Sequence, residues 1–222
     1  MRGLLAVIFS LTGLALFGQT STTQVAPGAR GQLNTLLNKP AMVEPVSITS
    51  LGKNWFRLGT DAHVITDEVG FEQVAAVLFD SKNTNAIFNG KKSRLLGNVV
   101  SQTADEAIVD FEMISFGPLG IQIKTPYRAS VKNVERTATI SAVEIRQLAT
   151  DSAANKEIKN LFATRYAEEI NIAGIKYIYI RIYALDDVNA SILPGARGVL
   201  ENAAVPSNIE ALELIIAAAK KR

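Results

Sequence analysis

Apolar positions that alternate with polar ones run through most of the chain after residue 45 and predict a domain rich in β-strands. The clearest case is 107–116, where Val109, Phe111 and Met113 fall on one face and carboxylates fall on the other. Weaker versions of the pattern, bounded by turn residues, predict six more strands. We place them at 54–65, 94–101, 121–134, 137–148, 165–172 and 175–184.

Helical spacing replaces the alternation in three segments before the last helix. Apolar residues at i, i+3, i+4 and i+7 predict a helix that ends near Phe79, with Thr66 as its N-cap. A short helix at 84–89 is expected to stop at Gly90. The segment 151–162 also has helical spacing, and we expect it to cap a loop.

The final helix has the strongest local signals of any element. Ser207-Asn208-Ile209-Glu210 has the form of a capping box, which predicts that the helix begins at Ser207 and that Glu210 reaches back to the Ser207 amide. Its side chains are apolar almost all round, so the helix must be buried on most sides. One face is formed by Leu212, Ile215, Ile216 and Ala219.

The composition is that of a globular protein, with 48% hydrophobic and 20% charged residues. The 23 basic and 21 acidic residues are nearly balanced, and Lys and Arg cluster only at 220–222, which argues against a nucleic-acid partner. The chain has no cysteine, so disulfides and thiolate chemistry are excluded.

The N-terminus resembles a secretory signal peptide. Arg2 precedes an apolar run, 4–17, that is short for a membrane span of about 20 residues, and a polar stretch follows. We expect a signal peptide at 1–19, a flexible tether at 20–45 and one folded domain at 46–222. The alternative is an uncleaved N-terminal anchor. Export without disulfides favours a bacterial periplasmic or secreted protein.

The order of elements resembles the helix-grip or START-like superfamily, which includes plant allergens and polyketide cyclases. The first helix with its Asp (71–80), the hairpin of 166–169 and 177–183, and Ile192-Leu193-Pro194 before the last helix carry the resemblance. The tryptophan that often follows the helix-ending Asp is missing, and Ile87-Phe88 lies nearby. The resemblance implies an α+β fold, in which a curved antiparallel sheet wraps around a long C-terminal helix. It also implies a cavity between them for a lipid, a sterol or an aromatic ligand.

Ligand contacts are therefore expected from the last helix (Leu212, Ile215, Ile216, Ala219) and from the strand face of Val109, Phe111 and Met113. The strand 175–184 leaves two arrangements open. Either its isoleucines face the last helix, or Tyr177, Tyr179 and Arg181 face a pocket as polar contacts. A buried Arg181 would need a partner such as Glu144 or Glu169, and that requirement favours inward isoleucines.

Candidate catalytic and metal-binding residues are sparse. His63 has neither a cysteine nor a second histidine to join, so it is expected to be an ordinary strand residue. Gly90-Lys91-Lys92-Ser93 lacks the earlier glycine of a phosphate-binding loop. Asp186-Asp187 could hold calcium, but a solvated pair is the expected state. No metal and no cofactor are predicted.

These observations favour an exported carrier of a hydrophobic small molecule or lipid, with transient membrane contact and no nucleic-acid partner. A cyclase-type enzyme on the same fold would need an acid or base inside the pocket, for which His63 and Tyr179 are the available side chains. A third alternative is a non-enzymatic interaction protein with a filled core.

The expected signal peptide can be tested by measuring the mass of the protein recovered from its host. We expect cleavage between Gly18 and Ser21, so that the mature chain lacks the apolar run. A full-length mass in the membrane fraction would instead indicate an uncleaved anchor.

Overall fold

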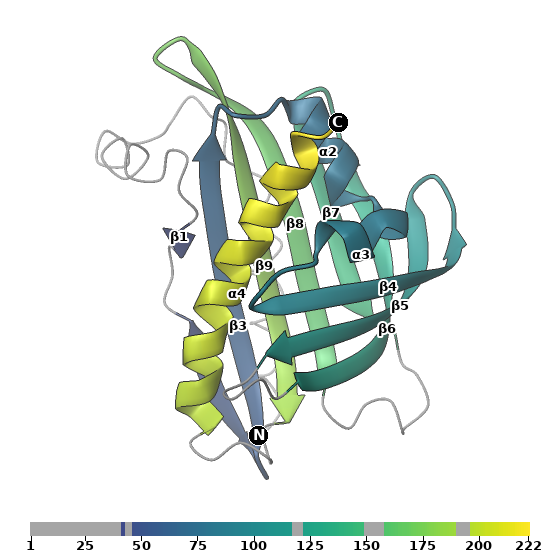
Figure 1. Ribbon diagram of the computed structural model, residues 1–222, viewed down its shortest axis with the longest axis vertical. Coiled ribbons are helices and arrows are strands. Elements are labelled where there is room, and N and C mark those ends of the chain that lie inside the picture. Colours follow the sequence, from purple (N-terminus) through teal and green to yellow (C-terminus); the bar gives the residue numbers. More distant parts are fainter. Residues whose placement is uncertain (1–40, 43–45, 117–121, 149–157, 190–195) are drawn as a thin grey trace, which may run out of the picture. The chain divides into compact units, whose positions relative to one another are not determined.

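The computed structural model describes residues 41–42, 46–116, 122–148, 158–189 and 196–222 (Figure 1). The expected signal peptide and most of the expected tether lie outside these residues. All the described residues belong to one compact unit, 36–222.

Nine strands and three α-helices are described in this unit. In chain order they are β1 (Ala41–Met42), β2 (Ser47–Gly52), β3 (Trp55–Thr66), α2 (Phe71–Leu78), the 3-10 turn η4 (Ser81–Asn83), α3 (Thr84–Ile87), β4 (Ser93–Gln102), β5 (Glu106–Phe116), β6 (Gln122–Arg136), β7 (Ile140–Gln147), β8 (Ile158–Ile172), β9 (Ile175–Asn189) and α4 (Ala196–Ala219).

All nine strands form a single antiparallel sheet in the order β1-β3-β9-β8-β7-β6-β5-β4, with β2 also paired to β3. Two hairpins turn through left-handed backbone at Lys53-Asn54 and at Ala173-Gly174. Both central residues of each turn have positive φ, which matches the right-handed twist of the flanking strands. The turn expected at Ala173-Gly174 is confirmed.

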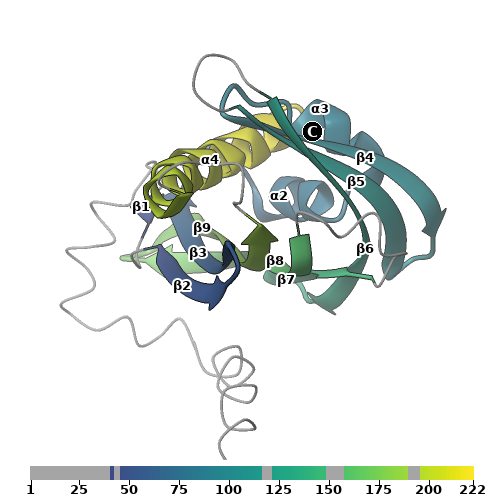
Figure 2. The ribbon, with the colours of Figure 1, turned by 90° about the horizontal axis from the view of Figure 1, so that it is seen from below.

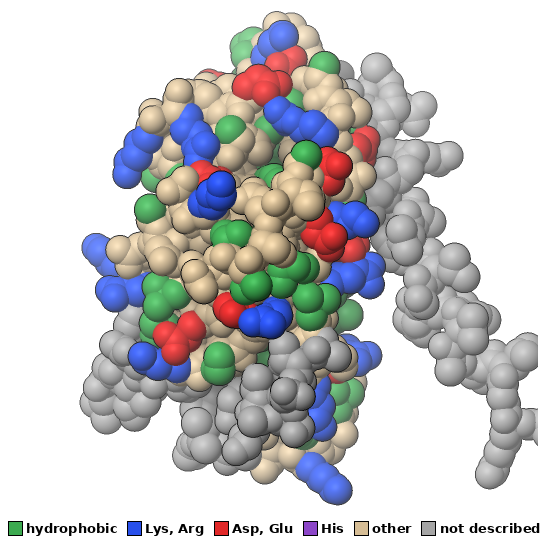
Figure 3. Space-filling view, turned by 90° about the vertical axis from the view of Figure 1, so that its right-hand side faces the viewer, with side chains coloured by type: hydrophobic (Ala, Val, Ile, Leu, Met, Phe, Trp, Pro, Cys, Tyr) green, Lys and Arg blue, Asp and Glu red, His purple; other side chains and the backbone are tan. Residues whose placement is uncertain are grey.

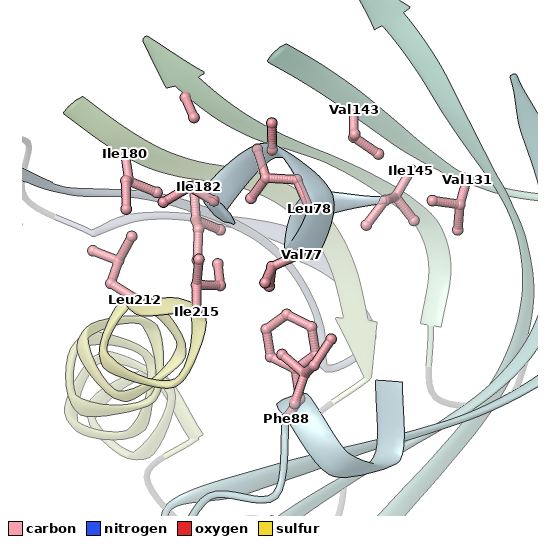
Figure 4. Packing of buried hydrophobic residues seen from close by; sticks show 14 of the residues in the cluster. Val77, Leu78, Phe88, Val131, Val143, Ile145, Ile180, Ile182, Leu212 and Ile215 are labelled. Carbon is pink, nitrogen blue, oxygen red and sulfur yellow. The ribbon is translucent and has the colours of Figure 1, made fainter. Parts of the chain in front are cut away.

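The sheet curves around α2 and α4, which lie on its concave face (Figure 2). Alternation along β9 directs Ile180 and Ile182 to this face, where Leu212 and Ile215 of α4 pack against them (Figure 4). Ile180, Leu212 and Ile215 are fully buried. Of the two arrangements that the sequence left open, the structure has the inward isoleucines. The expected α+β architecture, a curved sheet around a long C-terminal helix, is confirmed.

The C-terminal half of α4 is also held by polar contacts. The Glu210 carboxylate accepts hydrogen bonds from the backbone N–H groups of Lys91, Lys92 and Ser93, at 2.6, 2.8 and 3.2 Å. Farther along, Lys220 pairs with Glu68 and Arg222 with Asp80. The loop that fails the phosphate-binding pattern therefore binds an anion after all, and that anion is a carboxylate of the same chain.

The expected start of the last helix at Ser207 is wrong, because α4 begins eleven residues earlier, at Ala196. Pro206 lies inside the helix and removes one backbone hydrogen bond without ending it. The Glu210 carboxylate is bound to the backbone N–H groups of Lys91 and Lys92, just before β4, rather than to Ser207. A pattern typical of a helix start therefore lies in the middle of a helix.

Two other boundaries also differ from expectation. Thr66 is the last residue of β3 rather than an N-cap, and α2 begins at Phe71, where the Gly70 N–H donates to the Gln73 side chain. Residues 158–162 of the expected loop-capping helix belong to β8, which pairs with β9 along its length. The remaining part of that expected helix, 151–157, lies outside the described residues.

Charged side chains of both signs are interspersed over the face shown in Figure 3. Within the described parts of the chain, no helix has both the length and the apolar character needed to cross a membrane.

The Glu210 contact predicts a specific loss of stability. Glu210→Ala removes three charge-assisted hydrogen bonds and should lower the free energy of unfolding by ~2 kcal/mol in urea titrations. Glu213→Ala changes an exposed carboxylate one turn away and serves as the matched control. Equal stability of the two variants would contradict the anchoring role of Glu210.

Candidate ligand-binding site

The concave face of the sheet has two ends with different degrees of burial. At the end covered by α2 and the C-terminal half of α4, side chains such as Val64, Val143 and Ile180 are fully buried; we call this the sealed end. Toward the other end, five apolar side chains on the same face are only partly buried, although Ile158 is fully buried there, and we call this the accessible end. Its partly buried apolar residues are Leu58, Met113, Leu161, Ala163 and Val188.

Arg165 lies on the concave face at the sealed end. The register places it in one cross-strand row with Ala62, Ile182 and Val143. Its side chain is 8% exposed, its Nη1 donates to the Leu78 carbonyl at 3.3 Å, and its guanidinium lies 4.5 Å from the centre of the Phe88 ring. Burial lowers the pKa of Arg165 to about 10, so the group stays charged at neutral pH.

Tyr127 faces the same interior from β6. It is 7% exposed and its ring lies 5.3 Å from that of Phe111, its cross-strand neighbour. Burial raises its pKa; the charge of Asp186 raises it further, and that of Arg165 lowers it. Tyr127 is therefore within electrostatic range of both charges.

Asp186 supplies the third ionisable group on this face. It lies between Leu58 and Leu161 in a cross-strand row at the accessible end. Burial, with a smaller contribution from Asp187, raises the pKa of Asp186 to about 7. Its Oδ1 is buried and has no hydrogen-bond partner in the part of the chain that is described.

The neighbouring Asp187 has a different environment. It points to the outer face, where Arg57 donates to it at 2.7 and 2.9 Å and Asn160 donates at 2.6 Å. These donors lower its pKa. The expectation of a solvated loop pair is wrong, because both residues belong to β9 and alternate strand residues point to opposite faces. The two carboxylates therefore cannot share one cation.

The residues expected to contact a ligand fall into two separate groups. Leu212, Ile215, Ala219, Val109 and Phe111 are buried on the concave side, and Ile216 and Met113 pack against them partly buried. Most of this group forms the filled core at the sealed end. Phe111 and Met113 are the exceptions, because they extend toward Tyr127 and Thr125.

Tyr177, Tyr179 and Arg181 project from the outer face of β9, away from α4. Arg181 donates to Asp61 at 2.7 Å, so its partner is neither Glu144 nor Glu169. Burial raises the pKa of Tyr179 to about 12. A ligand beneath α4 would not reach these side chains.

His63 belongs to this outer group. It is a buried residue of β3, as expected, and its ring centre lies 5.6 Å from that of Tyr179. Burial lowers the pKa of His63. Neither His63 nor Tyr179 can serve chemistry on the concave face.

The sequence contained a signal for the polar residues that we did not predict. Arg165 follows Ala163 and precedes Ala167 at the inward positions of β8, and Asp186 continues the inward series of isoleucines on β9. A charged residue in an otherwise inward apolar series was therefore the available clue.

Two hollows are lined by described residues. One, of about 250 Å³, includes Arg57 and Asp187 of the outer face together with Leu161. The other, of about 360 Å³, lies beside α2 and includes Phe79 and Arg222. Both have charged side chains in their lining and are open to solvent, unlike an enclosed pocket for an apolar ligand.

This architecture is the helix-grip, or START-like, fold. Human StAR-related lipid transfer protein 5 superimposes with a TM-score of 0.53 over 81% of this chain and 88% of its own, at 10% identity.

Norcoclaurine synthase from Thalictrum flavum gives a TM-score of 0.46 at 10% identity, over 78% of this chain and 92% of its own. The di-domain aromatase/cyclase StfQ of the steffimycin biosynthetic pathway gives 0.46 at 14% identity, over 75% of this chain and 52% of its own. No protein-family model and no curated protein matches the sequence.

The raised pKa of Asp186 predicts a characteristic dependence of stability on pH. An acid whose pKa is higher in the folded state binds its proton more tightly there, so it lowers stability as pH rises from about 4 to about 7. Asp186→Asn should therefore gain stability relative to the wild type across this range, by ~1.4 kcal/mol for each pH unit. The measurement is urea unfolding at several pH values.

Asp105→Asn, at an exposed position, is the control and should keep the pH dependence of the wild type. A constant stability difference between Asp186→Asn and the wild type from pH 4 to pH 8 would show that Asp186 has an ordinary pKa.

Proposed function

We propose that this protein binds a small hydrophobic molecule at the accessible end of the concave face, between the β5–β6 wall and the β8–β9 wall. The observation that carries the proposal is the presence of Arg165, Tyr127 and Asp186 on that face. A filled core would leave Asp186 Oδ1 without a hydrogen-bond partner and the Arg165 cation without an opposite charge, and both cost free energy. A pocket with apolar walls and a few inward polar groups gives these atoms something to bind.

The apolar wall supports the same site. Phe111 and Met113 on one side and Leu161 and Ala163 on the other lie on the concave face and lead away from the sealed end. The fold agrees with this proposal, since the human neighbour named above is a lipid transfer protein. We infer a carrier or binder, and on the basis of the N-terminal segment we propose that it acts after export, with transient membrane contact.

A cyclase-type enzyme is the second candidate, and one observation favours it. Asp186 has a pKa of about 7 and lies within electrostatic range of the Tyr127 hydroxyl, so it could give or take a proton near neutral pH. If a bound compound is converted, Asp186→Asn should abolish the conversion and leave binding within threefold. Unchanged turnover in that variant would exclude Asp186 as the acid or base.

The binding site can be tested with two neighbouring residues of β8 that point to opposite faces. Leu161→Trp places a larger ring at the accessible end, whereas Phe162→Trp places the same ring on the outer face. We expect Leu161→Trp to weaken binding of the uncharged dye Nile red at least tenfold in a fluorescence titration. Phe162→Trp should change the affinity less than twofold.

Circular dichroism and thermal unfolding establish that both variants fold. Equal affinities in the two folded variants, or a wild type that binds neither Nile red nor any long-chain alcohol, would contradict the proposed site.

A further inference from the structure

Arg165 differs from the other arginines whose contacts are described. It is the one buried arginine of the described residues, and no carboxylate among them pairs with it. The arginines that do form ion pairs are more exposed: Arg57 with Asp187, Arg128 with Asp110, Arg136 with Glu72, Arg146 with Glu144, Arg181 with Asp61 and Arg222 with Asp80.

A structural role explains only part of this arrangement. Leu78 ends α2, so the hydrogen bond to its carbonyl caps the helix, and the Phe88 ring covers one face of the guanidinium. The cap uses one of the five N–H donors of an arginine and supplies no opposite charge. A buried cation without an anionic partner is strongly unfavourable.

Asp186 does not supply the missing charge. The pKa of Arg165 responds to burial and to Tyr127, and the pKa of Asp186 responds to burial and to Asp187. The pKa of Tyr127 responds to both Arg165 and Asp186. The phenol is therefore within electrostatic range of a cation and of an acid that do not neutralise each other.

We propose that the ligand is an apolar carboxylic acid, whose carboxylate is bound by the Arg165 guanidinium and the Tyr127 hydroxyl. Its apolar body extends along Phe111, Met113 and Leu161 toward the accessible end. This inference rests on the proposed function and names the chemical class of its ligand.

The donor set fits a carboxylate better than a phosphate. A guanidinium presents a planar pair of N–H donors that matches the two oxygens of a carboxylate. While Asp186 keeps its proton, below its pKa of about 7, one cation and one neutral hydroxyl balance a single negative charge. A phosphate monoester carries nearly two negative charges, and the concave face offers no second cation among its described residues. A fatty acid and an aromatic acid share the required group, so the experiment includes both.

The test compares ligands that differ only at the head group. Dodecanoic acid, dodecanol and methyl dodecanoate compete with Nile red for the full-length protein at pH 6, where Asp186 is protonated, and 1-naphthaleneacetic acid competes in a fourth arm. We expect the wild type to bind dodecanoic acid at least tenfold more tightly than dodecanol or the ester. Comparing the affinity for 1-naphthaleneacetic acid with that for dodecanoic acid then shows whether the site prefers an aromatic or an aliphatic body.

Arg165→Gln should abolish the preference for the acid, and Tyr127→Phe should reduce it about threefold. Arg128→Gln, which removes an exposed arginine of the outer face, is the matched control and should leave the preference unchanged. Should Arg165→Gln fail to fold, Arg165→Lys keeps the positive charge but loses the planar pair of donors, and it should lower the preference at least threefold.

Equal affinity of the wild type for acid, alcohol and ester would overturn the carboxylate assignment while leaving the proposed function intact. If folded Arg165 variants keep the full preference for the acid, the binding of the carboxylate by Arg165 is overturned, since Arg165 would then serve only as a cap. If Nile red and all four compounds fail to bind, the proposed function itself is wrong and the carboxylate assignment falls with it.

Discussion

The packing of α4 against the isoleucines of β9 is the interaction on which the rest of the structure depends. Leu212 and Ile215 are fully buried against Ile180 and Ile182, and the Glu210 carboxylate binds three backbone amides beside them. All these contacts involve the C-terminal half of the helix. They fill one end of the concave face, together with α2, and leave the other end with partly buried apolar side chains.

This unequal filling determines where a ligand can bind. At the sealed end an apolar ligand would gain little free energy from burial, because the side chains there are already closely packed against one another. At the accessible end an apolar guest would remove surface from water and would meet Tyr127 and Asp186. Arg165 lies at the sealed end, next along the inward side of β8 to Ala163 of the accessible end, so the two ends together can bind an apolar body and its anionic group.

The sequence predicted the fold well because strand alternation and the apolar last helix reflect burial directly. Boundaries were less predictable, since the capping pattern at Ser207 and the helical spacing of 158–162 are local signals that tertiary pairing overrode. The candidate site was mostly missed. Arg165 and Tyr127 come from strands far apart in sequence, and only the curvature of the sheet brings them within electrostatic range of each other.

The most direct measurement of the central claim is a crystal structure grown with 12-bromododecanoic acid, with the bromine located from its anomalous signal. The account predicts a bromine peak on the concave face beyond Met113 and Leu161, with the carboxylate at Arg165. A bromine on the outer face beside Tyr179 would contradict the account. So would crystals saturated with the acid in which the concave face binds none.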